Sequence, residues 1–332
     1  MQEIRLLKTG CSNYSRKEVE IISEVMKQGG LLVFPTETVY GIGADARSDV
    51  SCRRIYEAKG RESDNPLIVH VDSMETMSRF AHTEEVEMMP ELEKLWPGPL
   101  TVIMRKKDGI CNTATAGLNT VGMRIPDCNL IREAIKVSGV PLAAPSANIS
   151  GRPSATRASH ILKELGPLVD LVIDGEEATY GIESTVIFPE GRKCTILRPG
   201  AYTREDLLKI FDQVEFGGSE GRPLSPGTKY SHYTPEKTLY RSDREAIIKY
   251  MEKNHGKVLP IVTKETADIL GIECMVLGHS DKPMEISHNL YHCLRQLDKS
   301  PYDHGIIETF PHIGYFISIM NRIERASVKL EE

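Results

Sequence analysis

Short apolar runs alternate with amphipathic stretches along residues 1–212, and this alternation most strongly limits the folds open to the chain. Apolar runs predict buried strands, and apolar residues that recur every three or four positions predict helices. The first helix is expected between a capping box, Ser15 with Glu18, and the glycines 29–30. Strands are predicted at 31–34, 100–104, 120–125, 141–144, 171–173, 185–188 and 195–197, and helices at 51–58, 128–137, 157–165 and 204–211. The expected fold is α/β with a sizeable sheet, too irregular for a strict β-α-β repeat.

A second α/β pattern begins near residue 236, after a stretch (217–227) with the glycine, proline and serine content of a linker. Its expected strands are 257–262, 275–278 and 305–309, and its expected helices are 244–253, 286–297 and 313–326. A length of 332 residues agrees with two domains. The predicted division is a domain at 1–212, a linker at 213–235 and a second domain at 236–332.

The charge and hydropathy of the chain exclude several classes of protein. Lys and Arg number 41 against 47 Asp and Glu, for a net charge of −6, which argues against a protein that binds duplex DNA or anionic lipid. No apolar run approaches the length of a membrane helix, and the first residues lack the apolar core of a signal peptide. We therefore expect a soluble protein of the cytoplasm.

Seven cysteines are scattered along the chain without a C-x-x-C pair. A disulfide framework or a structural zinc site requires clustered cysteines in even numbers. The ten histidines are also dispersed, without a metal-ligand spacing. The pattern predicts a reduced protein without a disulfide framework or a structural zinc site.

Polar side chains gather where the predicted strands end, which is where binding sites usually form. Four of these side chains, Lys59, Arg61, Arg124 and Arg198, are basic in an otherwise acidic protein. Such clustering favours a concave pocket for an anionic ligand. A purely structural interpretation also exists, because proline and glycine mark strand ends and cations near residue 58 would cap a helix.

Seven motifs, in order, resemble the YrdC/YwlC-type threonylcarbamoyl-AMP synthases. They are PTETVYGIG (35–43), KGR…NPLIVH (59–70), WPGPLT (96–101), TVGMRIP (120–126), APSAN (144–148), ESTVI (183–187) and LRPG (197–200). The segments 225–235 and 314–322 resemble signatures of a second domain found in the two-domain form of the family. The resemblance implies a YrdC-like twisted mixed sheet with helices, joined by a linker to a smaller Rossmann-like α/β domain.

The resemblance also implies an activity, that of a nucleotidyltransferase which condenses L-threonine, bicarbonate or CO₂, and ATP into threonylcarbamoyl-AMP and pyrophosphate. Mg²⁺ is implied as a cofactor, held mainly by the ATP phosphates. A downstream transferase would then modify tRNA next to the anticodon, and a weak contact with tRNA or double-stranded RNA is compatible with the family.

The family's site residues map onto this sequence one by one. Because two anions must meet, cations are expected at the phosphates and a guanidinium fork at the threonine carboxylate. Residues 229–233 would fold over the nucleotide as a lid. The implied catalytic residues are Lys59, Arg61, Ser146 and Asn148. The implied ATP contacts are Lys59, Arg61, Asn65, Thr120, Ser146, Ser154, Arg198, His232 and Tyr233. The implied threonine contacts are Thr38, His70, Arg124, Ala144 and Ser184.

Two alternatives remain at this point. One is an RNA-binding module of a tRNA or rRNA maturation pathway, although the acidic charge and the lack of RNP-type aromatics argue against RNA as the main ligand. The other is a nicotinamide dinucleotide site at residues 41–46, which match G-x-G-x-x-A. Residues 35–38 interrupt the strand that such a site requires, so a glycine-rich turn is the simpler interpretation.

Overall fold

The computed structural model describes residues 4–217, 233–254 and 256–331, which form two compact units. The first unit comprises Met1–Ser150, Ala155–Ala178 and Glu183–Lys229, and the second comprises Gly151–Ser154, Thr179–Ile182 and Tyr230–Glu332. The first unit extends past the expected boundary at 212, because strand β11 (Gln213–Phe216) pairs with β10 (Lys193–Arg198). Most of the expected linker, including His232 of the proposed lid, lies outside the described residues.

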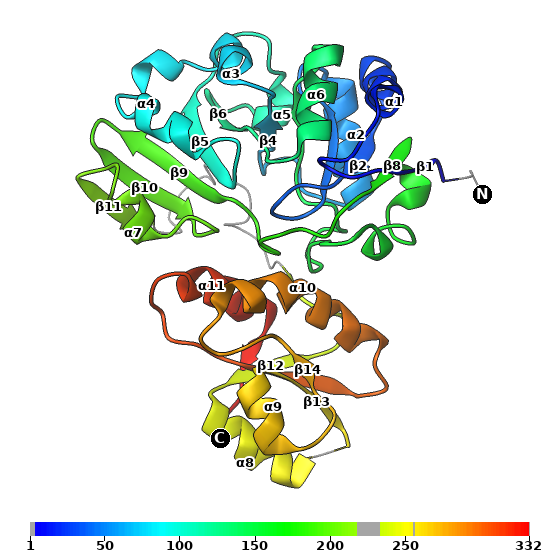
Figure 1. Cartoon of the computed structure of the whole chain (residues 1–332), viewed down its shortest axis with the longest axis vertical. Coiled ribbons are helices and arrows are strands. Elements are labelled where there is room, and N and C mark those ends of the chain that lie inside the picture. The colour runs from blue at the N-terminus through cyan, green and yellow to red at the C-terminus, as the bar shows by residue number, and fades with distance from the viewer. Residues whose placement is uncertain (1–3, 218–232, 255, 332) are drawn as a thin grey trace. The chain divides into compact units, whose positions relative to one another are not determined.

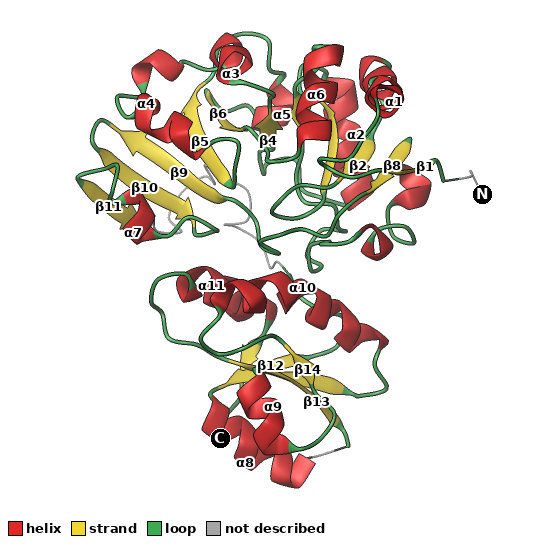
Figure 2. Ribbon diagram, in the orientation of Figure 1, coloured by secondary structure: helices red, strands yellow, loops and turns green. Residues whose placement is uncertain are grey.

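A mixed sheet runs through the first unit, with 11 strands among the described residues (Figures 1 and 2). Its strand order is β1-β8-β2-β3-β7-β4-β6-β5-β9-β10-β11, and parallel and antiparallel pairs both occur. The remaining strands are β1 (Leu6–Lys8), β2 (Leu32–Phe34), β3 (Gly41–Asp45), β4 (Ile68–His70), β5 (Leu100–Arg105), β6 (Thr120–Arg124), β7 (Leu142–Ala143), β8 (Leu171–Asp174) and β9 (Thr185–Glu190).

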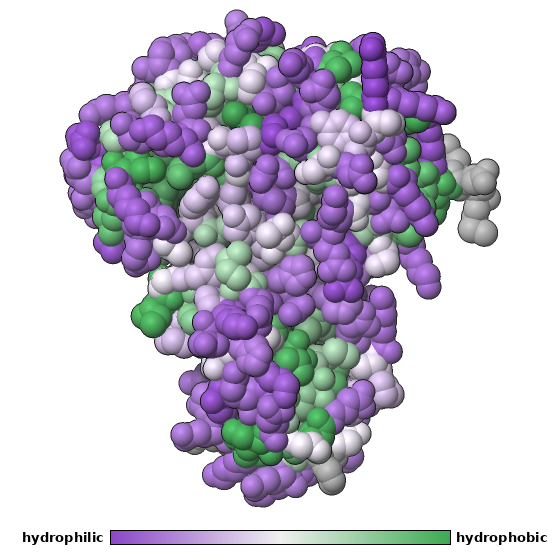
Figure 3. Space-filling model, in the orientation of Figure 1, coloured by the Kyte–Doolittle hydropathy of each residue, from purple (hydrophilic) through white to green (hydrophobic). Residues whose placement is uncertain are grey.

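Helices pack against this sheet and complete two apolar cores, one of which lies beneath α1 and α6. The helices are α1 (Arg16–Lys27), α2 (Asp49–Lys59), α3 (Met74–Phe80), α4 (Met89–Leu92), α5 (Asn112–Thr115), α6 (Asn129–Ser138) and α7 (Arg204–Leu207). Hydrophilic residues dominate the face of this unit seen in Figure 3, in keeping with cores that lie inside. No helix among the described residues is long and apolar enough to cross a membrane.

Most predicted elements are confirmed, because their signals are local. α1 begins after Ser15 with the expected capping box, and α2 ends at Gly60 in the left-handed conformation that glycine adopts readily. Two predictions are wrong. Residues 157–165 form a 3₁₀ turn (Ala158–His160) and further turns, in which i→i+3 hydrogen bonds dominate. Residues 41–45 form a strand, so the glycine-rich turn expected at 41–46 is wrong, and the alternative dinucleotide turn is excluded with it.

The second unit is a five-stranded sheet of parallel strands with helices on both faces, the Rossmann-like arrangement that was expected (Figure 2). Its strands are β12 (Leu239–Ser242), β13 (Val258–Val262), β14 (Met275–Val276), β15 (His304–Glu308) and β16 (Val328–Lys329), in the order β14-β13-β15-β12-β16. Its helices are α8 (Arg244–Asn254), α9 (Lys264–Leu270), α10 (Pro283–Lys299) and α11 (Phe316–Ala326).

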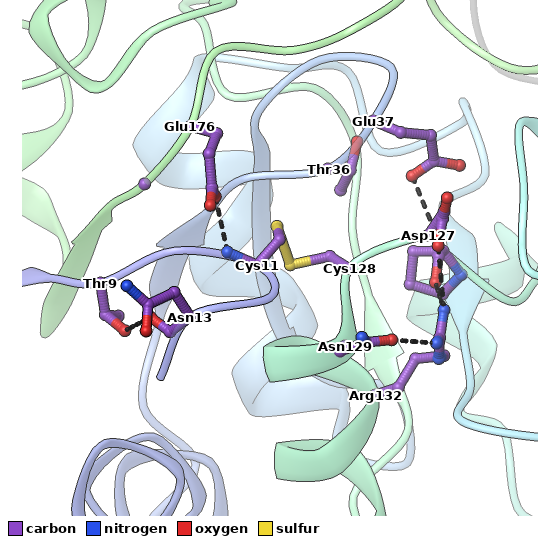
Figure 4. The surroundings of a disulfide bond; sticks show 12 residues. Thr9, Cys11, Asn13, Thr36, Glu37, Asp127, Cys128, Asn129, Arg132 and Glu176 are labelled. Carbon is purple, nitrogen blue, oxygen red and sulfur yellow. Dashed lines mark hydrogen bonds and ion pairs between the residues drawn. A yellow bond between two sulfur atoms is a disulfide. The ribbon is translucent and has the colours of Figure 1, made fainter. Parts of the chain in front are cut away.

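A disulfide joins Cys11 to Cys128, so the prediction of a chain without disulfides is wrong for this pair (Figure 4). The two cysteines are 117 residues apart in sequence, and only folding brings their Cα atoms to 4.7 Å. Cys11 follows β1, whereas Cys128 is the N-cap residue of α6. The bond therefore fixes the start of α6 to the segment after β1.

Loss of this disulfide should destabilise the first unit by about 2–4 kcal/mol, the usual effect of opening a long closed loop. The variant is Cys128→Ser, compared in urea with the unaltered protein with and without dithiothreitol. Fluorescence of Trp96, the one tryptophan of the chain, reports on the first unit. Cys274→Ser removes a thiol that is not in a disulfide and serves as the control. Identical unfolding curves with and without reductant would contradict the prediction.

Candidate active site

Two neighbouring parallel strands, β4 and β6, bring the first predicted ligands together. Their register pairs Ile68 with Gly122 and His70 with Arg124. Since alternate residues of a strand face the same side, Arg124 shares one face of the sheet with Gly122 and with His70. His70 and Arg124 thus lie side by side at the carboxyl ends of the two strands.

The same face continues across β5 and β9 to β10. On β5, Ile103 pairs with Gly122, which places Thr101, two residues earlier, on the face that carries Arg124. The hydroxyl of Thr101 lies 2.9 Å from that of Ser184, the residue that precedes β9. Arg198 of β10 donates to the carbonyl of Ser184 from Nε (3.1 Å) and Nη2 (3.0 Å) and to its hydroxyl (3.0 Å). Two nitrogens of the Arg198 guanidinium, Nε and Nη2, therefore hold Ser184 in position.

Two glycines let the backbone of β3 lie against an aromatic ring. A Cβ atom at Gly41 or Gly43 would stand 2.9 or 2.8 Å from the ring of Phe34. The ring of Phe34 in turn meets the His70 ring edge-on, with centroids 6.1 Å apart. Gly41 also bridges to Ser146. The glycines of the PTETVYGIG motif therefore serve a close approach rather than a turn.

The guanidinium of Arg124 is buried, with 4% of the residue exposed, and two side chains of the 35–40 loop hold it. Its Nη1 donates to the hydroxyl of Thr38 (3.0 Å), and its Nη2 donates to Oε1 of Glu37 (2.5 Å). Sequence reasoning missed Glu37. The signal available was its place between two threonines in a motif that otherwise supplies hydroxyls.

Three residues predicted to bind the substrates have buried polar atoms without a hydrogen-bond partner among the described residues. They are Oδ1 of Asn65, Nδ1 of His70 and Nε of Arg124. Buried polar atoms are almost always paired in folded proteins, so these atoms mark places where a polar ligand can bind. Burial, followed by the nearby Arg124 guanidinium, lowers the pKa of His70 to about 3, so its ring is neutral at physiological pH.

The hydroxyl of Thr38 can only accept a hydrogen bond from a ligand, because its own proton is already donated to Thr36. Thr36 donates its one hydroxyl proton to the carbonyl of Val39 (2.6 Å), so in its 2.9 Å contact with Thr38 the donor is Thr38. Thr38 Oγ1 also accepts from Arg124. The lone pair that remains on Thr38 can accept an N–H or O–H group from a ligand.

Lys59 holds the APSAN loop. Its ammonium is buried, with 1% of the residue exposed, and donates to the carbonyls of Ser146 and Asn148, each at 2.5 Å. The hydroxyl of Ser146 donates to Oδ1 of Asn148 at 2.6 Å. Three members of the predicted catalytic set thus form one hydrogen-bonded group, which joins the end of α2 to the segment after β7.

Other predicted ATP ligands gather at the amino ends of β4 and β6. Arg61 donates from Nη2 to the carbonyls of Asn65 and Pro66, both at 3.4 Å. Thr120 begins β6, so it lies about 13 Å from Arg124 along the strand. Asn65 and Thr120, predicted to bind the nucleotide, therefore lie at the opposite end of these two strands from His70 and Arg124, predicted to bind threonine.

The last predicted ligands lie elsewhere in the chain. Ala144 follows β7 and donates its N–H to the carbonyl of Ile68 on β4, in keeping with a backbone role. Ser154 and Tyr233 belong to the second unit. There, Arg295 of α10 donates to the carbonyl of Ser154 at 3.4 Å, and the ring of Tyr233 lies 5.3 Å from that of Tyr291.

Two family models match the chain. One, described as telomere recombination, matches residues 24–200, and the other, the threonylcarbamoyl-AMP synthase C-terminal domain, matches residues 202–328. The threonylcarbamoyl-AMP synthase of Pyrococcus abyssi is 36% identical over 93% of this chain and 94% of its own length. The Bacillus subtilis enzyme of that name is 34% identical over 91% of each. The chain belongs to the threonylcarbamoyl-AMP synthase family.

The fold of this threonylcarbamoyl-AMP synthase family member also agrees with a solved structure. The crystal structure of P. abyssi Sua5 complexed with L-threonine superposes with a TM-score of 0.88 at 32% identity. The match covers 98% of this chain and 99% of that one. The predicted fold class and family are thereby confirmed, and the chain is an enzyme rather than an RNA-binding module.

The neutral state of His70 in this synthase predicts a pH dependence of stability. The pKa of His70 is about 3 in the folded chain but near 6.5 when unfolded, so the unfolded chain alone takes up this proton between those values. Stability is therefore lost as the pH falls below 6.5, by about 1.4 kcal/mol between pH 7.5 and 5.5. Urea unfolding at the two pH values, followed by Trp96 fluorescence, measures this loss of stability. The His70→Asn variant should lose less stability over the same pH range, because it lacks the imidazole. An equal loss in that variant would contradict the assignment.

Proposed function

We propose that this chain converts L-threonine, bicarbonate or CO₂, and ATP into threonylcarbamoyl-AMP and pyrophosphate, the first step in threonylcarbamoyladenosine modification of tRNA. Membership of the synthase family supports the reaction, and a family structure described as complexed with L-threonine supports the amino acid. The observation that carries the proposal is the set of buried polar atoms on Asn65, His70 and Arg124 that have no hydrogen-bond partner in the described part of the chain.

The proposed chemistry needs charge neutralisation and alignment rather than a protein nucleophile. The threonine amine first forms a carbamate with CO₂, releasing a proton, or with bicarbonate, releasing water. A carbamate oxygen then attacks the α-phosphorus of ATP, and pyrophosphate leaves. Both reactants are anions, so nearby cations must stabilise the transition state.

Each end of the site has a proposed task. Arg124 binds the threonine carboxylate at the carboxyl end of β6, and His70, Ala144 and Ser184 lie around the amino acid. The hydroxyl of Thr38 accepts a hydrogen bond from the threonine hydroxyl or amine. In the first unit, the proposed nucleotide contacts are Lys59, Arg61, Asn65, Thr120, Ser146 and Arg198, and the reacting atoms meet near the APSAN loop. The family resemblance also assigns Ser154, His232 and Tyr233 to the nucleotide.

We propose that Mg²⁺ enters with ATP and is held mainly by its phosphates. Among the described residues, no group of three or more His, Cys, Asp or Glu side chains could hold a metal ion. A downstream tRNA threonylcarbamoyl transferase is the proposed consumer of the product, and the cytoplasm is the proposed location.

Pyrophosphate release tests the proposed function. The full chain is given ATP, Mg²⁺ and bicarbonate, with and without L-threonine, and threonylcarbamoyl-AMP is identified by mass spectrometry. We expect release that depends on threonine and equals the adenylate formed. Pyrophosphate release at the same rate with and without threonine would refute the proposal.

The two cations of the KGR motif should respond differently to substitution. Lys59→Met should lower turnover by about 10²-fold or more and also destabilise the fold by about 1–3 kcal/mol, because two buried carbonyls lose their donor. Arg61→Ala should lower turnover comparably but cost less stability than Lys59→Met, because Arg61 is only half-buried. Pyrophosphate release and urea unfolding measure the two effects. Wild-type turnover in both variants would reject the phosphate assignment.

The Thr38 hydroxyl predicts amino-acid selectivity. Serine lacks one methyl group, so its kcat/KM should be lower than that of threonine by a factor that corresponds to about 1–3 kcal/mol. Valine should be essentially inactive, because it leaves the buried Thr38 acceptor unsatisfied. Thr38→Val should narrow the gap between threonine and valine, measured as kcat/KM for each amino acid.

Two further variants control for this effect. Thr38→Ser retains the hydroxyl and should retain the gap between threonine and valine. Arg124→Ala should weaken threonine, serine and valine together, because all three share the carboxylate. Comparable activity with valine and threonine in the unaltered enzyme would show that no side chain reads the hydroxyl.

A further inference from the structure

Glu37, on the loop between β2 and β3, contacts the end of β6 and the segment that follows it. It is buried, with 7% of the residue exposed. Its Oε1 accepts from Nη2 of Arg124 at 2.5 Å, and its Oε2 accepts from the backbone N–H of Asp127 at 2.9 Å. Figure 4 shows this second bond beside the disulfide, one residue before Cys128. Both carboxylate oxygens are therefore committed to donors at fixed positions.

The two contacts restrict how the Arg124 guanidinium can turn. Thr38 binds Nη1 and Glu37 binds Nη2, whereas Nε has no partner among the described residues. A guanidinium presents five N–H bonds in one plane, so fixing both terminal nitrogens also fixes the direction of the Nε edge. An arginine edge with parallel N–H bonds matches the two oxygens of a carboxylate.

We infer that Glu37 is a positioning residue, which orients the Arg124 guanidinium so that its Nε edge receives the carboxylate of the amino-acid substrate. This inference rests on the proposed function, because it takes the substrate to be an α-amino acid. Glu37 itself does not touch the substrate in this arrangement. Its negative charge offsets that of Arg124 in the buried pocket before the amino acid binds.

An amide cannot replace this carboxylate. Glutamine has one acceptor oxygen and one donor NH₂ group, whereas Glu37 faces a donor at each oxygen. Glu37→Gln therefore loses either the contact with Arg124 or the contact with Asp127. The shape of the side chain is retained, so the orientation of Arg124 changes with little change in packing.

The test is binding of radiolabelled L-threonine to the full chain by equilibrium dialysis, followed by steady-state kinetics. We expect Glu37→Gln to raise the threonine Kd and KM at least tenfold, with the KM for ATP changed less than twofold. The preference for threonine over threoninamide, which lacks the carboxylate, should shrink by a similar factor. A purely structural role would weaken threonine and threoninamide equally and would overturn the inference.

Glu308→Gln is the matched control. Glu308 is also buried, at 3% exposure, and accepts from Nε of Arg244 at 3.2 Å, but it lies in the second unit. Its substitution should leave the threonine Kd within twofold, and a tenfold rise there would overturn the inference. In an Arg124→Ala background, Glu37→Gln should have no further effect, because Glu37 acts through Arg124; additive losses would also overturn it.

Glu37→Asp keeps the charge with a shorter reach and should bind threonine with an affinity between those of the unaltered enzyme and Glu37→Gln. It also provides a second variant if Glu37→Gln fails to fold. If the unaltered enzyme binds no threonine, the proposed function fails, and the inference fails with it. If the unaltered enzyme binds threonine and neither variant changes the affinity, the inference alone fails.

Discussion

The burial of the Arg124 guanidinium is the constraint on which the site depends. A cation removed from water is costly unless hydrogen-bond acceptors surround it, and the 35–40 loop supplies two of them through Glu37 and Thr38. The course of this loop is thus tied to β6. Because Thr38 donates its hydroxyl proton to Thr36, the Thr38 oxygen can accept, but not donate, a hydrogen bond with a ligand.

Three contacts support the candidate site residues, and each joins segments that are distant in sequence. The Cys11–Cys128 disulfide fixes the segment that anchors Glu37, and Lys59 fixes the APSAN loop to the end of α2. Arg198 fixes Ser184 at the start of β9. Several side chains that the family resemblance assigns to the substrates therefore also hold other such side chains in place. Such preorganisation keeps reactive groups oriented before the substrate binds.

The direction of β4 and β6 separates residues proposed to bind the amino acid from residues proposed to bind the nucleotide. Side chains proposed for the amino acid lie at the carboxyl ends of these strands, whereas Asn65 and Thr120, proposed for the nucleotide, lie at or before their amino ends. In the proposed arrangement, the reacting groups meet between the two ends, close to the loop that Lys59 holds. A pair of short parallel strands can thus align two anionic substrates without a nucleophile from the protein.

The sequence by itself determined most helices and strands, the family and the residue types of the site, because caps, hydrophobic periodicity and motif order are local properties. Tertiary structure alone decided that His70, Arg124 and Ser184 share one region of the sheet, since strand register is set by pairing between distant segments. It also decided that the Lys59 ammonium binds carbonyls and that Glu37 is buried against Arg124. A sequence shows which donors and acceptors are available, but only the packed fold determines which of them meet and which remain for a ligand.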